Sequence, residues 1–136
     1  MYPTQEEIME DGPGFDIETF QSILNVWKDI CYKDKWSQAS TLEKLSSLEF
    51  LATMMTKAKT TLGTLYSYNP DTDTISIDYN NPSIISTLHE IGHALFGSSE
   101  LKACKFSVWL FKTVFPKAFQ KLKWDGHMLK KDYDKD

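Results

Sequence analysis

The 136-residue chain has the length of one domain, and its 41% hydrophobic and 25% charged residues are typical of a soluble globular protein. Lys112 interrupts the longest apolar run, residues 106–115, which argues against a membrane-spanning helix. The acidic, polar start of the chain predicts no secretory leader. Cys31 and Cys104 fall in separate helical patterns, so we expect buried free thiols in a reducing, cytoplasmic environment.

Charge is distributed unevenly along the chain, whose net charge is −4. Residues 1–100 hold six lysines against fifteen acidic residues, whereas residues 101–136 hold nine lysines against four. All fifteen basic residues are lysines, so bidentate guanidinium contacts to guanine or phosphate are excluded and direct nucleic-acid binding is not expected. The C-terminal lysines either attract an acidic partner or form a solvated helix face.

Two helices are predicted in the first half of the chain. Residues 1–14, which end in a Gly-Pro-Gly sequence, are predicted to be a flexible lead-in. Asp16 is placed to cap a helix that ends near residue 32. Ser40 and Glu43 form a capping box for a second helix, which Gly63 would end. Helical spacing assigns to the buried faces Ile17, Phe20, Ile23, Leu24, Trp27 and Ile30 in the first helix, and Leu42, Leu45, Leu48, Leu51, Met54, Met55 and Ala58 in the second.

A β-hairpin is predicted next, because the hydrophobic period changes from 3.6 to about 2. Residues 65–68 and 75–79 alternate in this way on either side of an Asn-Pro-Asp-Thr-Asp turn sequence. Asn81 and Pro82 are placed to start a third helix, which ends near Gly97.

Two more helices complete the prediction. The fourth is capped by Ser98 or Ser99 and ends at the next proline, and a short fifth helix covers residues 117–124. Residues 128–136 are predicted to be a flexible tail. These elements predict an α+β fold with a single domain over residues 1–136.

The third helix carries the sequence His89-Glu90-Ile91-Gly92-His93. Histidines at i and i+4 project from one helix face, so both imidazoles can reach one zinc ion. Glu90 lies where it can accept a proton from a zinc-bound water. The alternative is a buried helix with satisfied core histidines, but burying two imidazoles and a carboxylate on one face without a metal is costly. We therefore predict one zinc ion per chain, with Glu90 catalytic.

A catalytic zinc site usually has three protein ligands, and two residues are candidates for the third. Glu100 follows His93 in the first turn of the next helix and would face the metal if Gly97 makes a tight turn. Without a metal it would be an ordinary first-turn glutamate that the helix dipole favours. His127 is the remaining histidine, and it would give an all-histidine site.

His89-Glu-x-x-His93, a short turn and Glu100-x-x-Ala103-x-x-Phe106 resemble the gluzincin branch of the zincin metallopeptidases. The order of elements is most similar to small ImmA/IrrE-type domains, which are intracellular zinc peptidases that in some cases cleave transcriptional repressors. The resemblance is specific over residues 86–110 and architectural over residues 16–80, and it implies Glu100 as the third ligand. Two features depart from the family pattern. The loop before Glu100 is short, and Cys104 stands where an acidic residue often follows.

The resemblance implies a zinc-dependent peptidase that acts on a protein or peptide substrate. Zinc would be held by His89, His93 and Glu100, and Glu90 would be the general base. The edge of the hairpin near residues 75–79 could align an extended substrate. The alternative is a zinc-binding regulatory or interaction protein of zincin fold that acts on a protein or DNA-bound partner without robust proteolysis.

Three roles remain open for His127. It is a surface residue, a donor to the developing oxyanion, or the third ligand, as in the SprT-like zincins. The hairpin tyrosines Tyr66, Tyr68 and Tyr79 are alternative oxyanion donors, although tyrosines on a strand mostly serve packing.

Overall fold

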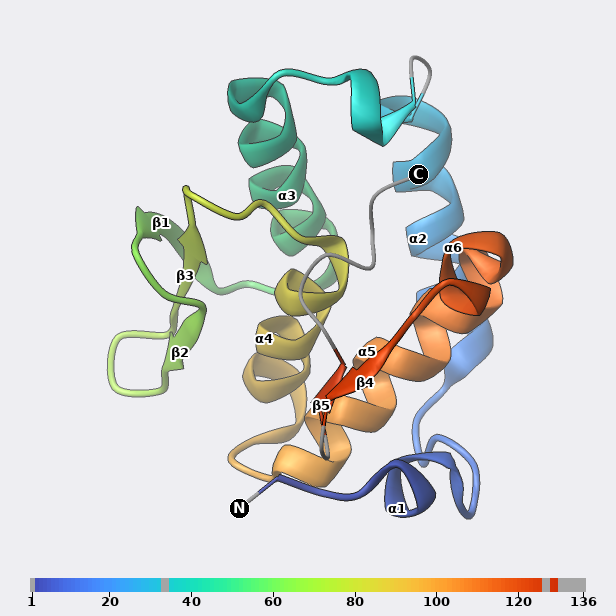
Figure 1. Ribbon diagram of the computed structural model, residues 1–136. Coiled ribbons are helices and arrows are strands. Elements are labelled where there is room, and N and C mark those ends of the chain that lie inside the picture. The colour runs from blue at the N-terminus through green and yellow to red at the C-terminus, as the bar shows by residue number, and fades with distance from the viewer. Residues whose placement is uncertain (1, 33–34, 126–127, 130–136) are drawn as a thin grey trace.

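Helices dominate the computed structural model, which describes residues 2–32, 35–125 and 128–129 (Figure 1). Within these residues, six α-helices and a three-stranded sheet form one small mixed α/β domain. The predicted elements occur in the predicted order. Additional elements are present at the N-terminus and beside the hairpin, together with a two-stranded pair of β4 (Trp124–Asp125) and β5 (Met128–Leu129).

Helices α2 (Ile17–Cys31) and α3 (Thr41–Met55) begin where their capping sequences predict. The Asp16 side chain accepts from the backbone N–H of Thr19, and Ser40 and Glu43 form both hydrogen bonds of the capping box. Two residues assigned to the buried faces are instead exposed, Ile30 to 53% and Leu42 to 73%. Ile30 lies in the last turn of α2 and Leu42 in the first turn of α3.

Residues 1–14 contain an additional helix, α1 (Gln5–Met9), where sequence reasoning expected a flexible lead-in. Thr4 and Glu7 form its capping box, and Ile8 is buried. Helix α5 (Glu100–Val114) holds this segment by two long side chains. Trp109 Nε1 donates to the Ile8 carbonyl at 3.0 Å, and Lys105 Nζ donates to the Glu10 carbonyl at 2.8 Å.

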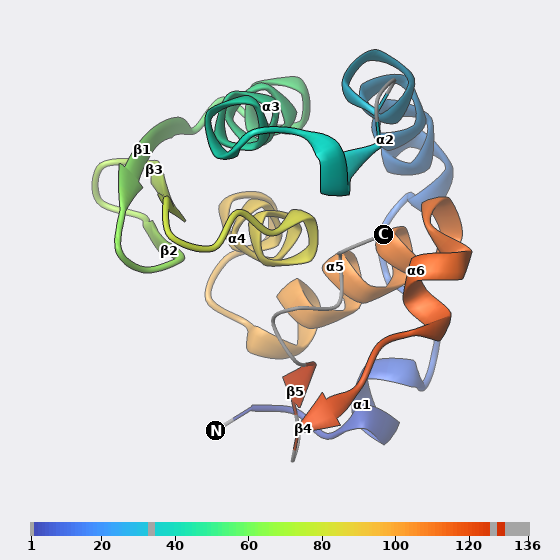
Figure 2. The same ribbon diagram turned by 45° about the horizontal axis from the view of Figure 1, so that its top comes forward.

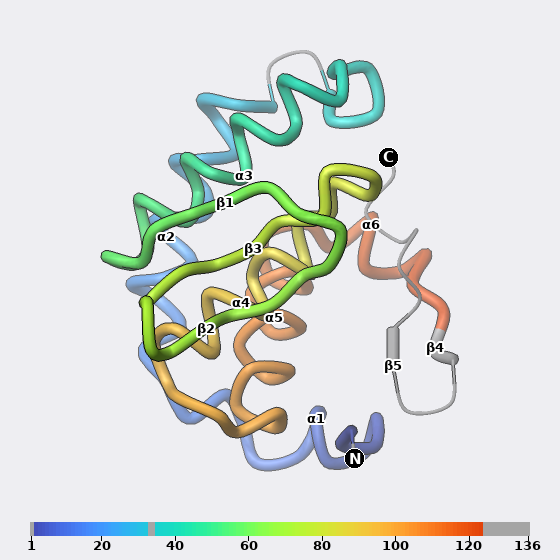
Figure 3. The backbone as a smooth tube through the Cα atoms, turned by 90° about the vertical axis from the view of Figure 1, so that its left-hand side faces the viewer, coloured from blue at the N-terminus to red at the C-terminus, as the bar shows by residue number. Residues whose placement is uncertain are grey.

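The predicted hairpin is present as β2 (Ser67–Asn69) and β3 (Thr74–Asp78), which pair antiparallel. A strand that sequence reasoning missed, β1 (Lys59–Gly63), pairs parallel to β3, so that β3 lies in the middle of the sheet (Figure 3). Helix α3 therefore ends at Met55 and does not continue to Gly63. The helical spacing continues to Ala58, but the Lys-Thr-Thr sequence that follows favours a strand because its threonines are β-branched.

Helix α4 (Ile84–Phe96) lies between the sheet and α5, and it also packs against α3 (Figure 2). Its N-cap is Ser83, not the predicted Asn81 and Pro82, because the Ser83 hydroxyl accepts from the backbone N–H of Ser86. Its apolar side packs into the core, where Ile84, Ile85, Leu88 and Ile91 are buried. The polar side that remains is where the motif histidines project.

The C-terminal half continues with α5, which Ser99 caps, and α6 (Pro116–Gln120). Helix α6 begins at Pro116, so the last predicted helix is confirmed but ends before Trp124. Among the described residues, none of the helices combines the length and the apolar character that crossing a membrane requires.

Candidate metal centre

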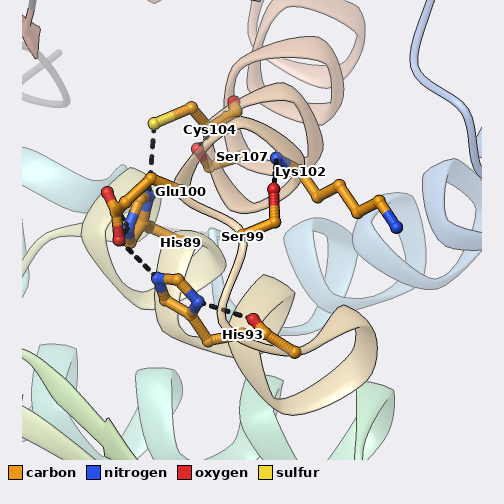
Figure 4. A network of polar contacts seen from close by, with 8 residues as sticks. His89, His93, Ser99, Glu100, Lys102, Cys104 and Ser107 are labelled. Atoms are coloured by element: carbon orange, nitrogen blue, oxygen red, sulfur yellow. Dashed lines mark hydrogen bonds and ion pairs between the residues drawn. The ribbon is translucent and has the colours of Figure 1, made fainter. Parts of the chain in front are cut away.

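The site forms at the corner between α4 and α5 (Figure 4). His89 and His93 are one turn apart on α4, and their ring centroids are 4.8 Å apart. Gly97 ends α4 with φ 93° and ψ −157°, a conformation that residues other than glycine rarely adopt. The chain reverses there, and Ser99 caps α5, whose first residue is Glu100. The predicted tight turn at Gly97 is therefore present.

The Glu100 carboxylate lies between the two imidazoles. Its Oε1 is 2.7 Å from His93 Nε2 and 3.4 Å from His89 Nε2, and its Oε2 is 3.3 Å from His89 Nε2. The His89 imidazole, which hydrogen-bonds the carboxylate, holds the pKa of Glu100 down to about 2 against the opposing effect of burial, with a further contribution from His93. The structure thus brings together His89, His93 and Glu100, the three residues predicted as ligands.

The opposite ring nitrogens of the histidines contact other groups. His93 Nδ1 lies 2.8 Å from the carbonyl oxygen of Gly97, and His89 Nδ1 lies 3.8 Å from the Sγ atom of Cys104. A carbonyl only accepts, so His93 carries its hydrogen on Nδ1. In the neutral ring, Nε2 then presents a lone pair to the Glu100 carboxylate, and two acceptors at 2.7 Å require a proton or a cation between them.

The donor atoms fit a metal ion. Ligand atoms of His89, Glu100 and Cys104 all lie within 4.8 Å of one another, so this group could hold a metal, and His93 adjoins it through Glu100 Oε1. Glu100 Oε2 is buried and accepts no hydrogen bond from the described residues, its nearest polar contact being His89 Nε2 at 3.3 Å, and a cation would satisfy it. Ligand atoms around tetrahedral zinc are about 3.3 Å apart. The contacts of Glu100 with His89 already have this spacing, and the shorter contact with His93 would have to open.

Glu90 is 8% exposed, on the same helix as the two histidines. Burial raises the pKa of Glu90, the neighbouring imidazoles of His89 and His93 act in the opposite direction, and the Glu100 carboxylate raises it. A carboxyl group with a raised pKa is better suited to accept and return a proton near neutral pH.

Cys104 is the site residue whose role sequence reasoning missed. Burial, together with the negative charges of Glu100 and Glu90, raises its pKa to about 12, so the sulfur is a protonated thiol. Both cysteines are free, as predicted, although Cys31 is half-buried and not fully buried. The signal for Cys104 was its i+4 spacing from Glu100, which places both side chains on one face of α5.

Two of the three hairpin tyrosines are engaged in structural contacts. The Tyr66 hydroxyl accepts from the backbone N–H of Ser83 at 2.7 Å and donates to the Asn81 carbonyl at 2.8 Å, which fixes the start of α4. The Tyr68 hydroxyl donates to Asp73 within the hairpin. His127 lies outside the described residues.

The close approach of α4 and α5 depends on Gly92. A Cβ atom at this position would lie 3.0 Å from Ala103 Cα and 3.4 Å from Ala103 Cβ. We expect Gly92→Ala to lower the free energy of unfolding by about 1–3 kcal/mol, because backbone atoms must move apart. In an ordinary helix interior the same change raises stability by up to about 1 kcal/mol. Urea unfolding would measure the sign, and an unchanged or higher midpoint would contradict the tight packing.

Comparisons with known proteins add no relative to this description. No family model matches the chain, and neither the curated proteins nor the solved structures include a significant match.

Proposed function

We propose that this chain is a zinc-dependent peptidase similar to the gluzincins and the small ImmA/IrrE-type domains. The observation that supports it best is the Glu100 carboxylate, which lies between the Nε2 atoms of the two motif histidines. His89, His93 and Glu100 would hold one zinc ion, the three-ligand set of catalytic zinc. The substrate would be a protein or a peptide.

When bound, zinc would lower the pKa of its water and polarise the scissile carbonyl group. Glu90 would accept the proton of the attacking water and later pass it to the leaving amine. The Gly97 carbonyl would keep His93 in the tautomer whose Nε2 is free for the metal. The assignment of His127 to stabilising the developing oxyanion remains part of this proposal.

The position of the substrate differs from the sequence prediction. Residues 75–79 lie largely in β3, which is the central strand and is paired on both sides, so they offer no free edge. Strand β2 contacts α4, and its second edge is unpaired within the described sheet. We therefore assign the alignment of an extended peptide to the main chain of Ser67–Asn69.

The proposal includes a cellular setting, for which the cysteines are the support. Free thiols at Cys31 and Cys104 suit a reducing compartment, so we place the peptidase in the cytoplasm, acting on intracellular proteins.

A second function is favoured by one observation, the nearness of the Cys104 sulfur to His89 and Glu100. A site that used Cys104 as a further ligand would be closed to substrate, as structural zinc sites are. The protein would then be a zinc-binding regulatory or interaction protein without robust proteolysis. Glu90 argues for the peptidase, because a closed site has no use for a buried carboxylate beside it.

The protein purified without chelator should contain about one zinc per chain, as one three-ligand site predicts. Elemental analysis would measure the stoichiometry, and a fluorescent unfolded protein would report hydrolysis. Protein that contains no zinc and takes up none on titration would exclude both functions. Zinc at full occupancy with no hydrolysis of several unfolded substrates would favour the regulatory protein.

A further inference from the structure

Two side chains of α5 contact opposite edges of the same imidazole (Figure 4). Glu100 lies 3.3 Å from Nε2 of His89, and Cys104, one turn later, has its Sγ 3.8 Å from Nδ1 of that ring. Side chains at i and i+4 lie on one helix face, so two residues one turn apart on α5 contact both ring nitrogens of His89. Cys104 is 5% exposed, so this contact is shielded from water.

The direction of the contact matters for metal binding. The two nitrogens of an imidazole point away from each other, so a group that fixes Nδ1 determines where the lone pair of Nε2 points. When a metal takes the Nε2 lone pair, the ring hydrogen lies on Nδ1, and the Cys104 sulfur can then accept from Nδ1–H and stabilise this tautomer. For His93 the Gly97 carbonyl occupies the corresponding position, at 2.8 Å.

We propose that Cys104 is the positioning residue of His89, and that its thiol holds the ring in the orientation and tautomer that bind the metal beside Glu100. This inference rests on the proposed zinc site. It explains how the site does without the acidic residue that the gluzincin pattern leads one to expect at this position. The thiol replaces a carboxylate as the outer partner of a metal ligand.

The rival arrangement makes Cys104 itself a ligand. Its Sγ lies on the Nδ1 side of His89, whereas the carboxylate and His93 gather on the Nε2 side. A metal bound to Nε2 would lie on the other side of the ring from the sulfur, whereas a metal shared by His89, Glu100 and Cys104 would leave His93, the second motif histidine, out of the ligand set. The geometry therefore favours positioning over ligation.

A thiol sulfur is a weak hydrogen-bond acceptor, so the hold on His89 is weaker than a carboxylate would give. This difference makes a gain of function possible. The Asp side chain reaches further than the Cys side chain, and its carboxylate would form a charge-assisted bond with Nδ1–H. Cys104→Asp should bind zinc more tightly than the parent, which a poorly folded protein would not do.

The test compares the zinc affinities of the purified parent and three variants by competition with a chromophoric chelator. We expect Cys104→Ala to lower the affinity about tenfold and Cys104→Asp to raise it about tenfold, the range found for outer partners of metal ligands. Cys31→Ala, which removes the other free thiol, at the end of helix α2, should leave the affinity unchanged. Equal affinities in all four proteins would overturn the positioning role and leave the proposed zinc site intact.

Two spectroscopic measurements separate positioning from ligation. Nitrogen NMR of labelled histidine in the metal-free proteins should show a larger fraction of the Nδ1–H tautomer for His89 in the parent than in Cys104→Ala. Cobalt substituted for zinc should give no thiolate charge-transfer band in the near ultraviolet. A strong band that disappears in Cys104→Ala would show direct ligation by sulfur and overturn the proposal. A parent that binds no zinc would remove both the proposed function and this inference.

Discussion

Replacing Glu90 with glutamine should lower peptidase turnover by about 10²–10⁴-fold, the usual contribution of a general base. Zinc content should stay at the level of the parent. The amide has nearly the shape of the carboxyl group, so the buried position beside His89 and His93 remains filled, but it cannot accept a proton at neutral pH. Turnover and zinc content measured on the same preparation would show whether turnover is lost while the zinc stays bound.

The control for this variant is Glu18→Gln, the same chemical change at an exposed position in the first turn of α2. It should alter neither turnover nor zinc content. Equal turnover in Glu90→Gln and the parent would mean that another group takes the proton. The proposed metal site would survive that result, since Glu90 is not among its ligands.

Replacing Glu100 with glutamine should instead weaken zinc binding itself, and turnover would be lost as a consequence. We expect zinc affinity to fall by more than about a hundredfold, because outer partners alone are worth 10–100-fold and Glu100 contacts both histidines directly. The amide removes the negative charge that faces Nε2 of each ring. Competition with a chelator of known affinity would measure the loss.

His127→Ala is the matching test of the all-histidine alternative. It should keep the metal and at most slow turnover, whereas Glu100→Gln should lose the metal. The reverse pattern would make His127 the third ligand and place the chain closer to the SprT-like zincins. Glu90 would keep its proposed role in either case, so this pair of variants tests only the identity of the third ligand.

The site was more predictable than the fold around it. The spacing of His89 and His93 determines that both rings share a helix face, and Gly97 makes the turn that places Glu100 opposite them. The contact of Cys104 with His89 depends on how α4 and α5 cross. The spacing of residues in the sequence does not determine that crossing. The raised pKa of Glu90 likewise depends on burial that only the packed structure supplies.

Among the fold elements, the capped helices and the hairpin were predicted because their signals are local. Strand β1 was missed because its pairing with β3 is a tertiary contact and it directly follows a helical pattern that extends to Ala58. Helix α1 was missed although Thr4 and Glu7 form a capping box, because it is only five residues long and is held by the burial of Ile8 and the bond from Trp109. In each case a distant contact overrides a weak local signal.

The candidate ligands are close in sequence as well as in space. Glu100 lies seven residues from His93 and eleven from His89, whereas the bond from Trp109 to Ile8 joins residues 101 positions apart. The entropy lost on closing a loop grows with its length, so the α4–α5 corner costs little chain entropy to assemble. The corner can therefore form early in folding, as a two-helix unit that needs few distant partners. The remaining elements then pack against the apolar side of the α4–α5 corner.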